Sequence, residues 1–143
     1  MNTVKVFDSY DRQALTDYEY TKKTYDGFVY IIEAGNAVKI GSTQHLDQRM
    51  RQLFSMLRNY ANVKIGRIAV TIPHMNYRDN EKTIHKVFSS SRINGGEMFD
   101  VKFCDAILEL NSLSYDTSDE LRNAKKKQAD RSFEFLKAWF LNS

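Results

Sequence analysis

Two short apolar segments joined by a polar turn constrain this chain more than any other feature. Residues 27–32 and 38–41 are rich in β-branched and aromatic side chains, which is typical of β-strands. Gly35 and Asn36 lie between the two segments. Both residue types tolerate the backbone angles of tight turns. The sequence therefore predicts a β-hairpin.

The parity of this hairpin predicts a mixed polar surface. Side chains alternate between the two faces of a strand, so a loop of two or four residues places Tyr30, Lys39 and Gly41 on one face. A loop of odd length or a bulge would break this arrangement. A phenol, an ammonium group and a bare glycine backbone would then share a surface suited to an anionic substrate.

The rest of the chain is predicted to be mostly helical, with one further strand. Residues 45–58 carry an apolar stripe at helical spacing, with Ser42 and Thr43 as candidate N-caps. A strand is expected within residues 62–71. Further helices are expected over residues 8–23 with Ser9 as the cap, 77–89, 105–113 and 118–141, with a turn at 92–96.

This order of elements predicts a mixed α/β fold of the α+β kind. We expect a small three-stranded sheet flanked by helices. Residues 1–26 are expected to form an N-terminal extension, 27–103 the core and 104–143 a C-terminal helical extension. The last helix has an apolar face that should cover the core or join two subunits in a homodimer; its members are Leu121, Phe135, Leu136, Trp139 and Phe140.

Length, composition and charge limit the domain number, the cysteine chemistry and the expected location of the protein. A chain of 143 residues is most simply one domain with elaborations. Cys104 is its single cysteine, which excludes an internal disulfide and a cysteine-rich zinc site. The sequence has no long apolar run, so we expect an intracellular, cytoplasmic protein without a membrane span, in the host cell if the protein is viral. The net charge of +3 permits nucleic-acid binding without demonstrating it.

The hairpin and the residues after it resemble the GIY-YIG nuclease superfamily. The motif order is a strand with Tyr30, a turn, the triplet Lys39-Ile40-Gly41, Arg49 ten residues after Lys39, and Glu81 in a later helix. The segment 96–99, Gly-Glu-Met-Phe, follows. The sequence looks most like the Lys-Ile-Gly branch, which is common in phage and mobile-element proteins. The resemblance covers about residues 27–101.

This resemblance implies a site for phosphodiester hydrolysis. It implies catalytic roles for Tyr30, Lys39 and Arg49, and it makes Glu81 the ligand of Mg²⁺ or Mn²⁺. His85 shares a helix face with Glu81 because the two are four residues apart. It is a candidate general base or a group that supports the metal ligand. We expect Tyr30, Lys39, Arg49 and Glu81 to converge on one open pocket.

Each candidate also has a purely structural interpretation. Tyr30 is a common type of half-buried strand residue, and Lys39 is compatible with a solvated strand position. Glu81 is compatible with a surface carboxylate beside His85. Glu97 can support the site or cap a backbone donor, whereas His45 and His74 have no ligand spacing.

Two functional hypotheses from different classes follow. The first is a metal-dependent endonuclease that hydrolyses DNA and is encoded by a phage or mobile element. The alternative is a non-cleaving module of the same fold, such as a phage anti-defence protein that binds nucleic acid or a host protein. Lys39, which stands where many GIY-YIG nucleases carry a second tyrosine, keeps this alternative open. The basic run Lys125–Lys127 is either a solvated face or a contact to the DNA backbone.

Overall fold

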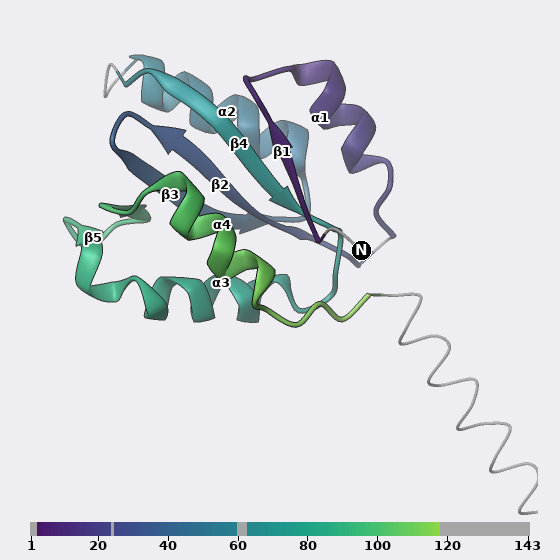
Figure 1. Cartoon of the computed structure of the whole chain (residues 1–143). Helices are drawn as coiled ribbons and strands as arrows, with labels where there is room; N and C mark the ends of the chain where they lie inside the picture. The colour runs from purple at the N-terminus through teal and green to yellow at the C-terminus, as the bar shows by residue number, and fades with distance from the viewer. Residues whose placement is uncertain (1–2, 24, 60–62, 118–143) are drawn as a thin grey trace, which may run out of the picture.

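The structure is a computed structural model that describes residues 3–23, 25–59 and 63–117 (Figure 1). It is a mixed α+β fold built around one antiparallel sheet of six strands in the order β1-β4-β2-β3-β6-β5. The strands are β1 Val4–Phe7, β2 Phe28–Ala34, β3 Ala37–Thr43, β4 Ile65–Thr71, β5 Arg92–Ile93 and β6 Met98–Phe99. The helices are α1 Arg12–Glu19, α2 Leu46–Asn59, α3 Tyr77–Val87, the short 3₁₀ helix η1 Ser89–Ser91 and α4 Phe103–Asn111.

The predicted hairpin is present with a two-residue turn. Ala34 pairs with Ala37, so that Gly35 and Asn36 form the loop, and Tyr30 pairs with Gly41. Gly35 has a φ of 63°, the left-handed conformation that glycine adopts without strain. This even-length loop places Tyr30, Lys39 and Gly41 on one face of the sheet, which confirms the parity argument.

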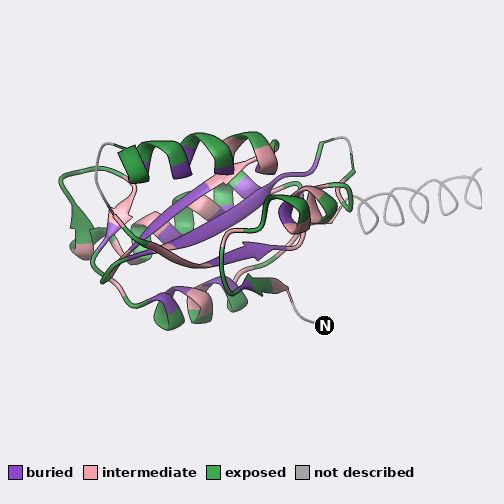
Figure 2. Ribbon diagram, turned by 90° about the horizontal axis from the view of Figure 1, so that it is seen from above, coloured by how far each residue is buried: buried purple, intermediate pink, exposed green. Residues whose placement is uncertain are grey.

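Helices cover both faces of the sheet (Figures 1 and 2). On one face, α1 and α2 pack against alternate residues of β2 and β4, including Phe28, Tyr30 and Ile32. The opposite face carries α3 and α4, which pack on Val29 and Ile31 and their neighbours. Both clusters consist of buried apolar side chains, so the central strands β2 and β4 have a core on each side, whereas β3 contributes Val38 and Ile40 to the α3–α4 side.

The sheet is larger than the three strands that the sequence predicts. The predicted strands are the central ones, and β1, β5 and β6 extend the sheet on both sides. These additional strands span only two to four residues each. Such short segments have too little alternation to be recognised, and they are stabilised by pairing with a sheet that is already formed.

The helix boundaries differ from the predicted ones, most of all for the helix predicted over residues 8–23, which spans only Arg12–Glu19. Helix α1 begins after Asp11, whose carboxylate accepts a hydrogen bond from the Ala14 backbone N–H at 3.2 Å, and not after Ser9. Helix α4 begins two residues earlier than expected and buries Phe103 and Leu110 against the sheet. The predicted terminal helix over 118–141, with its apolar face and the run Lys125–Lys127, lies outside the described residues.

Among the helices of the described ranges, none has the length and apolar character needed to cross a membrane.

The buried residue His74 contacts both Gly27, just before β2, and Tyr115, near the end of the described residues. His74 is fully buried and forms a β-bridge with Gly27, and its ring lies edge-on to that of Tyr115 at 4.7 Å between centroids. Its Nδ1 lies 2.8 Å from the Ile72 carbonyl oxygen and must donate to it. Nε2 is buried and has no hydrogen-bond partner within the described residues. Burial therefore holds the pKa of His74 below its ordinary value of 6.5, although the Ile72 hydrogen bond and the charges of nearby carboxylates act in the opposite direction.

This burial predicts a loss of stability in mild acid. The unfolded chain binds a proton at His74 near pH 6.5, whereas the folded chain binds it only at lower pH. Stability should therefore fall as the pH drops from about 6.5 to the lowered pKa. Each kcal/mol of this linkage lowers Tm by about 2–8 °C. Thermal unfolding from pH 7.5 to 5 should show a smaller decrease for His74→Gln than for the wild type. The exposed His45 provides the control: His45→Gln should follow the wild-type curve, and equal pH dependence of all three proteins would contradict the prediction.

Candidate active site

The hydroxyl of Tyr30 lies directly over the backbone of Gly41 on the neighbouring strand. Tyr30 is 1% exposed, and a Cβ placed at position 41 would come within 2.6 Å of the Tyr30 Cζ. The ring therefore fits only because residue 41 has no side chain. Burial raises the pKa of Tyr30 to about 12, with the charges of Glu97 and Glu81 adding to the effect and Arg49 opposing it. The phenol is neutral at physiological pH.

Arg49 approaches the same hydroxyl from α2. Its Nε lies 3.3 Å from the Tyr30 Oη, and because a guanidinium only donates, the phenol oxygen is the acceptor. The Tyr30 hydrogen is consequently left to donate to another group. The side chain of Arg49 is 36% exposed, so the guanidinium is in contact with solvent while its stem packs at the edge of α2.

Glu97 connects the two cations of the site. Its Oε2 lies 3.1 Å from Lys39 Nζ and 3.9 Å from Arg49 Nη2. Lys39 is only 7% exposed, so this carboxylate supplies the counter-charge that a buried ammonium requires. The Glu97 carbonyl oxygen also accepts a hydrogen bond of 3.0 Å from the Ile40 backbone N–H, which fixes the backbone of Glu97 beside β3.

Glu81 and His85 reach the same strand from the opposite side. Both lie on α3, which covers the other face of the sheet, and the Glu81 carboxylate accepts a hydrogen bond from the Ser42 hydroxyl. His85 Nε2 lies 2.8 Å from the Ile40 carbonyl oxygen and donates to it. His85 Nδ1 then accepts from Arg92 at 3.1 Å. Both ring nitrogens of a neutral His85 are engaged, an arrangement that favours a supporting role over that of a general base.

The two sets of side chains approach one another at the outer edge of β3. Strand β6 pairs with β3 only at Val38 and Lys39, and beyond Ile40 the described residues provide no strand partner on that side. Tyr30, Lys39 and Arg49 belong to the face covered by α2, whereas Glu81 comes from the face covered by α3. The charge of Glu81 nevertheless contributes to the pKa shifts of Tyr30 and Arg49. The convergence of all four on one open pocket stays a prediction.

The roles of Ser42 and Glu97 in the structure differ from the predicted ones. Ser42 was predicted as a helix N-cap, and Glu97 only as a residue that supports the site. The expected N-caps Ser42 and Thr43 are both wrong, because α2 begins at Leu46 and the His45 carbonyl oxygen accepts its first helical hydrogen bond, from Arg49. The Thr43 hydroxyl accepts from the His45 backbone N–H at 2.9 Å, a local turn, while the Ser42 hydroxyl donates to Glu81. Glu97 is central because β6 pairs with β3, and a two-residue strand has no pattern that reveals its partner. The double glycine before Glu97 was the one available signal of a turn that returns the chain to the sheet.

A divalent cation at this edge would be held through the Glu81 carboxylate. Within the described residues, no three or more His, Cys, Asp or Glu side chains are grouped so that they could hold a metal ion together. A site closed by protein ligands alone is therefore not formed there. A single carboxylate such as Glu81, whose side chain is 21% exposed, can hold Mg²⁺ when water and a substrate phosphate supply the remaining oxygens.

A scan against family models identifies the T5orf172 domain over residues 27–114. The chain belongs to the T5orf172 domain family. This domain is associated with phages and occurs often in nuclease-like proteins, and the match is to its model and not to a GIY-YIG model. The comparison with curated proteins finds no match, and neither does the comparison with solved structures.

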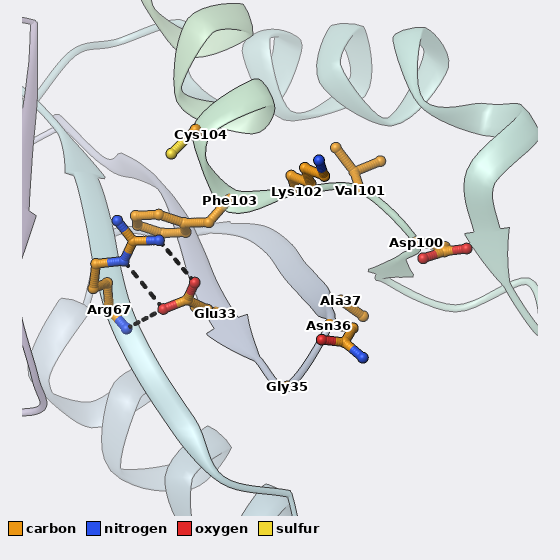
Figure 3. Close-up of a pocket in the computed structure, with 10 residues that line it drawn as sticks. All are labelled: Glu33, Gly35, Asn36, Ala37, Arg67, Asp100, Val101, Lys102, Phe103 and Cys104. Carbon is orange, nitrogen blue, oxygen red and sulfur yellow. Dashed lines mark hydrogen bonds and ion pairs between the residues drawn. The ribbon is translucent and has the colours of Figure 1, made fainter.

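The T5orf172 domain also contains a cavity that lies away from this site (Figure 3). The cavity of about 560 Å³ is at the turn of the β2–β3 hairpin, beneath the start of α4. Its main charged groups neutralise each other, since Arg67 donates to both carboxylate oxygens of Glu33 at 3.2 and 2.9 Å and stacks over Phe103. None of the candidate site residues lines this cavity.

The close fit of Tyr30 over Gly41 predicts the effect of one added methyl group. Gly41→Ala should displace the Tyr30 ring and cost about 1–3 kcal/mol of unfolding free energy in urea denaturation. Gly96→Ala is the matched control, because its nearest Cβ contact would be the Ile93 carbonyl oxygen at 3.8 Å. That variant should remain within about 0.5 kcal/mol of the wild type. Equal stability of the two variants would show that Tyr30 does not occupy this position.

Proposed function

We propose that this T5orf172 domain is a metal-dependent endonuclease that hydrolyses phosphodiester bonds in DNA at the outer edge of β3. The observation that carries the proposal is the hydrogen bond of Arg49 to a buried Tyr30 over Gly41, with the carboxylate of Glu81 at the same strand. The same residues support the finer assignment to the Lys-Ile-Gly branch of the GIY-YIG nucleases.

Tyr30 is suited to position an oxygen atom and not to act as a base in the resting enzyme. With a pKa of about 12, the phenol keeps its proton near pH 7. Because its oxygen accepts from Arg49, its O–H group is free to donate to a water molecule or to a phosphate oxygen. A hydrogen-bond donor that is fixed in place stabilises the charge that develops on the phosphoryl oxygens.

The cations supply the remaining charge stabilisation. The Arg49 guanidinium can contact two phosphate oxygens at once, and Lys39 adds a point charge from the same face. A divalent ion bound through Glu81 would act as a Lewis acid toward the phosphoryl group and lower the pKa of a bound water. Ser42 holds the Glu81 carboxylate at the strand edge, and His85 holds helix α3 there through its bond to the Ile40 carbonyl oxygen; these are the supporting roles that we assign to them.

A basic row on α3 supports DNA as the partner. Arg78, Lys82 and Lys86 are exposed and four residues apart, so they line one side of the helix. The adjacent row contains Glu81 and His85, which face β3. Phosphates bound along the first row would lie beside the proposed catalytic edge.

One observation favours the alternative of a non-cleaving module. Lys39 and Arg49 both form ion pairs with Glu97, at 3.1 and 3.9 Å, so neither cation is free for a substrate unless Glu97 moves. A domain that keeps this ion pair when DNA is bound would bind nucleic acid or a host protein without cutting.

The endonuclease proposal predicts which side chains are required for cleavage. With Mg²⁺ or Mn²⁺ and supercoiled plasmid, Glu81→Gln and Arg49→Lys should each lower the cleavage rate by roughly 10²–10³-fold, the usual loss when a transition-state contact is removed. The matched controls are Glu109→Gln on α4 and Arg51→Lys on α2, the latter being paired with Asp47 at 3.4 Å. Both controls should cleave at nearly the wild-type rate.

Cleavage by Glu81→Gln at the wild-type rate would remove this residue from the mechanism. A wild-type protein that binds DNA but never cuts it would favour the non-cleaving module.

The basic row predicts a change in salt dependence. Each phosphate contact on duplex DNA contributes about 0.9 to the slope of log K against log[salt]. Replacing Arg78, Lys82 and Lys86 together by Gln should reduce the slope by up to about 2.7, measured by fluorescence anisotropy without divalent metal. Arg12, Arg51 and Arg58 are also exposed, and their triple Gln variant provides a control of equal charge. Equal loss of slope in both variants would show that α3 is not the contact surface.

A further inference from the structure

Lys39 and Arg49 point to the same oxygen atom. The Lys39 ammonium lies 3.1 Å and an Arg49 guanidinium nitrogen 3.9 Å from Oε2 of Glu97. The second contact of Arg49, through Nε, is to the Tyr30 hydroxyl at 3.3 Å. An anionic oxygen held between a lysine and an arginine, beside a phenol, is in the environment that a phosphate oxygen would require.

We propose that Lys39 and Arg49 form a binding seat for one phosphate group of the nucleic acid, which the Glu97 carboxylate occupies in the free protein and leaves when the phosphate binds. The proposal deepens the proposed function and rests on it for the identity of the substrate. The ligand chemistry is a phosphate monoanion or dianion.

Burial of Lys39 explains why the seat is filled before substrate arrives. A buried ammonium without a counter-charge would strongly destabilise the fold, and Glu97 prevents this. A phosphate oxygen provides the same counter-charge. The carboxylate is therefore required in the free protein and becomes dispensable once substrate is bound.

The attachment of Glu97 allows its side chain to move without its backbone. The backbone is fixed by the hydrogen bond from Ile40 to the Glu97 carbonyl oxygen. The residue follows a turn in which Asn94 and Gly95 have φ angles of 53° and 69°, and its side chain is 38% exposed. Rotation about the side-chain bonds is enough to carry the carboxylate into water.

The ion pair between Glu33 and Arg67, in contrast, holds its carboxylate firmly in place. Arg67 makes three hydrogen bonds to the Glu33 carboxylate, at 3.0, 3.2 and 2.9 Å, one of them from its backbone N–H. This pair bridges two strands, β2 and β4, and both partners are fixed by it. Among the described residues, the Glu97 carboxylate makes one direct hydrogen bond, to Lys39, and has a longer contact to Arg49.

Glu97 also sets a threshold for the ligand. Lys39 and Arg49 balance Glu81 and Glu97, so the site has no net charge while Glu97 is in place. A weak anion gains little by displacing a carboxylate that is already bonded. In a nucleic acid, the neighbouring phosphates also contact the protein, and these additional contacts offset the cost of moving Glu97.

The test compares two variants with the same change in charge. Binding of inorganic phosphate is followed by ³¹P NMR, and binding of a short DNA duplex by fluorescence anisotropy, both in EDTA so that no strand is cut. Glu97→Gln removes the competing charge and should tighten the binding of both probes roughly five- to twentyfold, the effect expected for one charge-assisted contact. Glu33→Gln should change both affinities less than about twofold, as expected of a distant screened charge.

A third variant tests whether the tighter binding depends on Lys39. Adding Lys39→Met to Glu97→Gln should abolish it, because the seat then has one cation. Glu97→Asp, whose carboxylate is one methylene shorter, should give a smaller gain and serves if Glu97→Gln fails to fold.

The proposal is overturned if the Glu97 variants bind phosphate no tighter than Glu33→Gln, if they bind it more weakly, or if the gain survives Lys39→Met. A gain in phosphate binding by a domain that never cleaves DNA would leave the seat in place and remove the endonuclease. Cleavage by the wild type without such a gain would remove the seat alone.

Discussion

The absence of a side chain at Gly41 is the constraint on which the candidate site depends. A buried tyrosine on β2 places its hydroxyl over the backbone of the neighbouring strand, and any Cβ there would overlap the ring. The hydroxyl is consequently held at the level of the sheet itself, where Arg49 reaches it from one covering layer and the charge of Glu81 acts on it from the other. A side chain at position 41 would displace the hydroxyl from its bond to Arg49.

The same edge requires protection of its backbone groups. Strand β6 is too short to pair along all of β3, and an unpaired strand edge leaves carbonyl and N–H groups that need partners. His85 satisfies the Ile40 carbonyl oxygen in place of a strand. Arg92 from β5 then bonds the other ring nitrogen, so the orientation of the ring is fixed from two elements. A histidine used in this way stabilises the open edge and holds the helix that presents Glu81.

Much of this arrangement follows from sequence patterns of short range. The hairpin, its parity and the apolar stripe of α2 depend on neighbouring residues, so they could be predicted and the structure agrees with them. The additional strands β1, β5 and β6 depend on pairing between distant segments, which no local period encodes. For the same reason the bond of Ser42 to Glu81 was not foreseen, because it joins residues 39 positions apart.

The charges that would attract DNA and the charges of the candidate site lie on different parts of the surface. The chain has a net charge of only +3, and the cations of the candidate site are balanced by carboxylates, so neither the whole molecule nor the site itself presents a strong positive field. The exposed basic row of α3, Arg78, Lys82 and Lys86, provides a local positive field beside the candidate site. Attraction can then act on any phosphate backbone. In our proposal, entry to the site also requires a phosphate that displaces the Glu97 carboxylate from its hydrogen bond with Lys39. A nuclease built in this way would be held on DNA by contacts that tolerate many sequences, and its selectivity would arise from the geometry at a single phosphate.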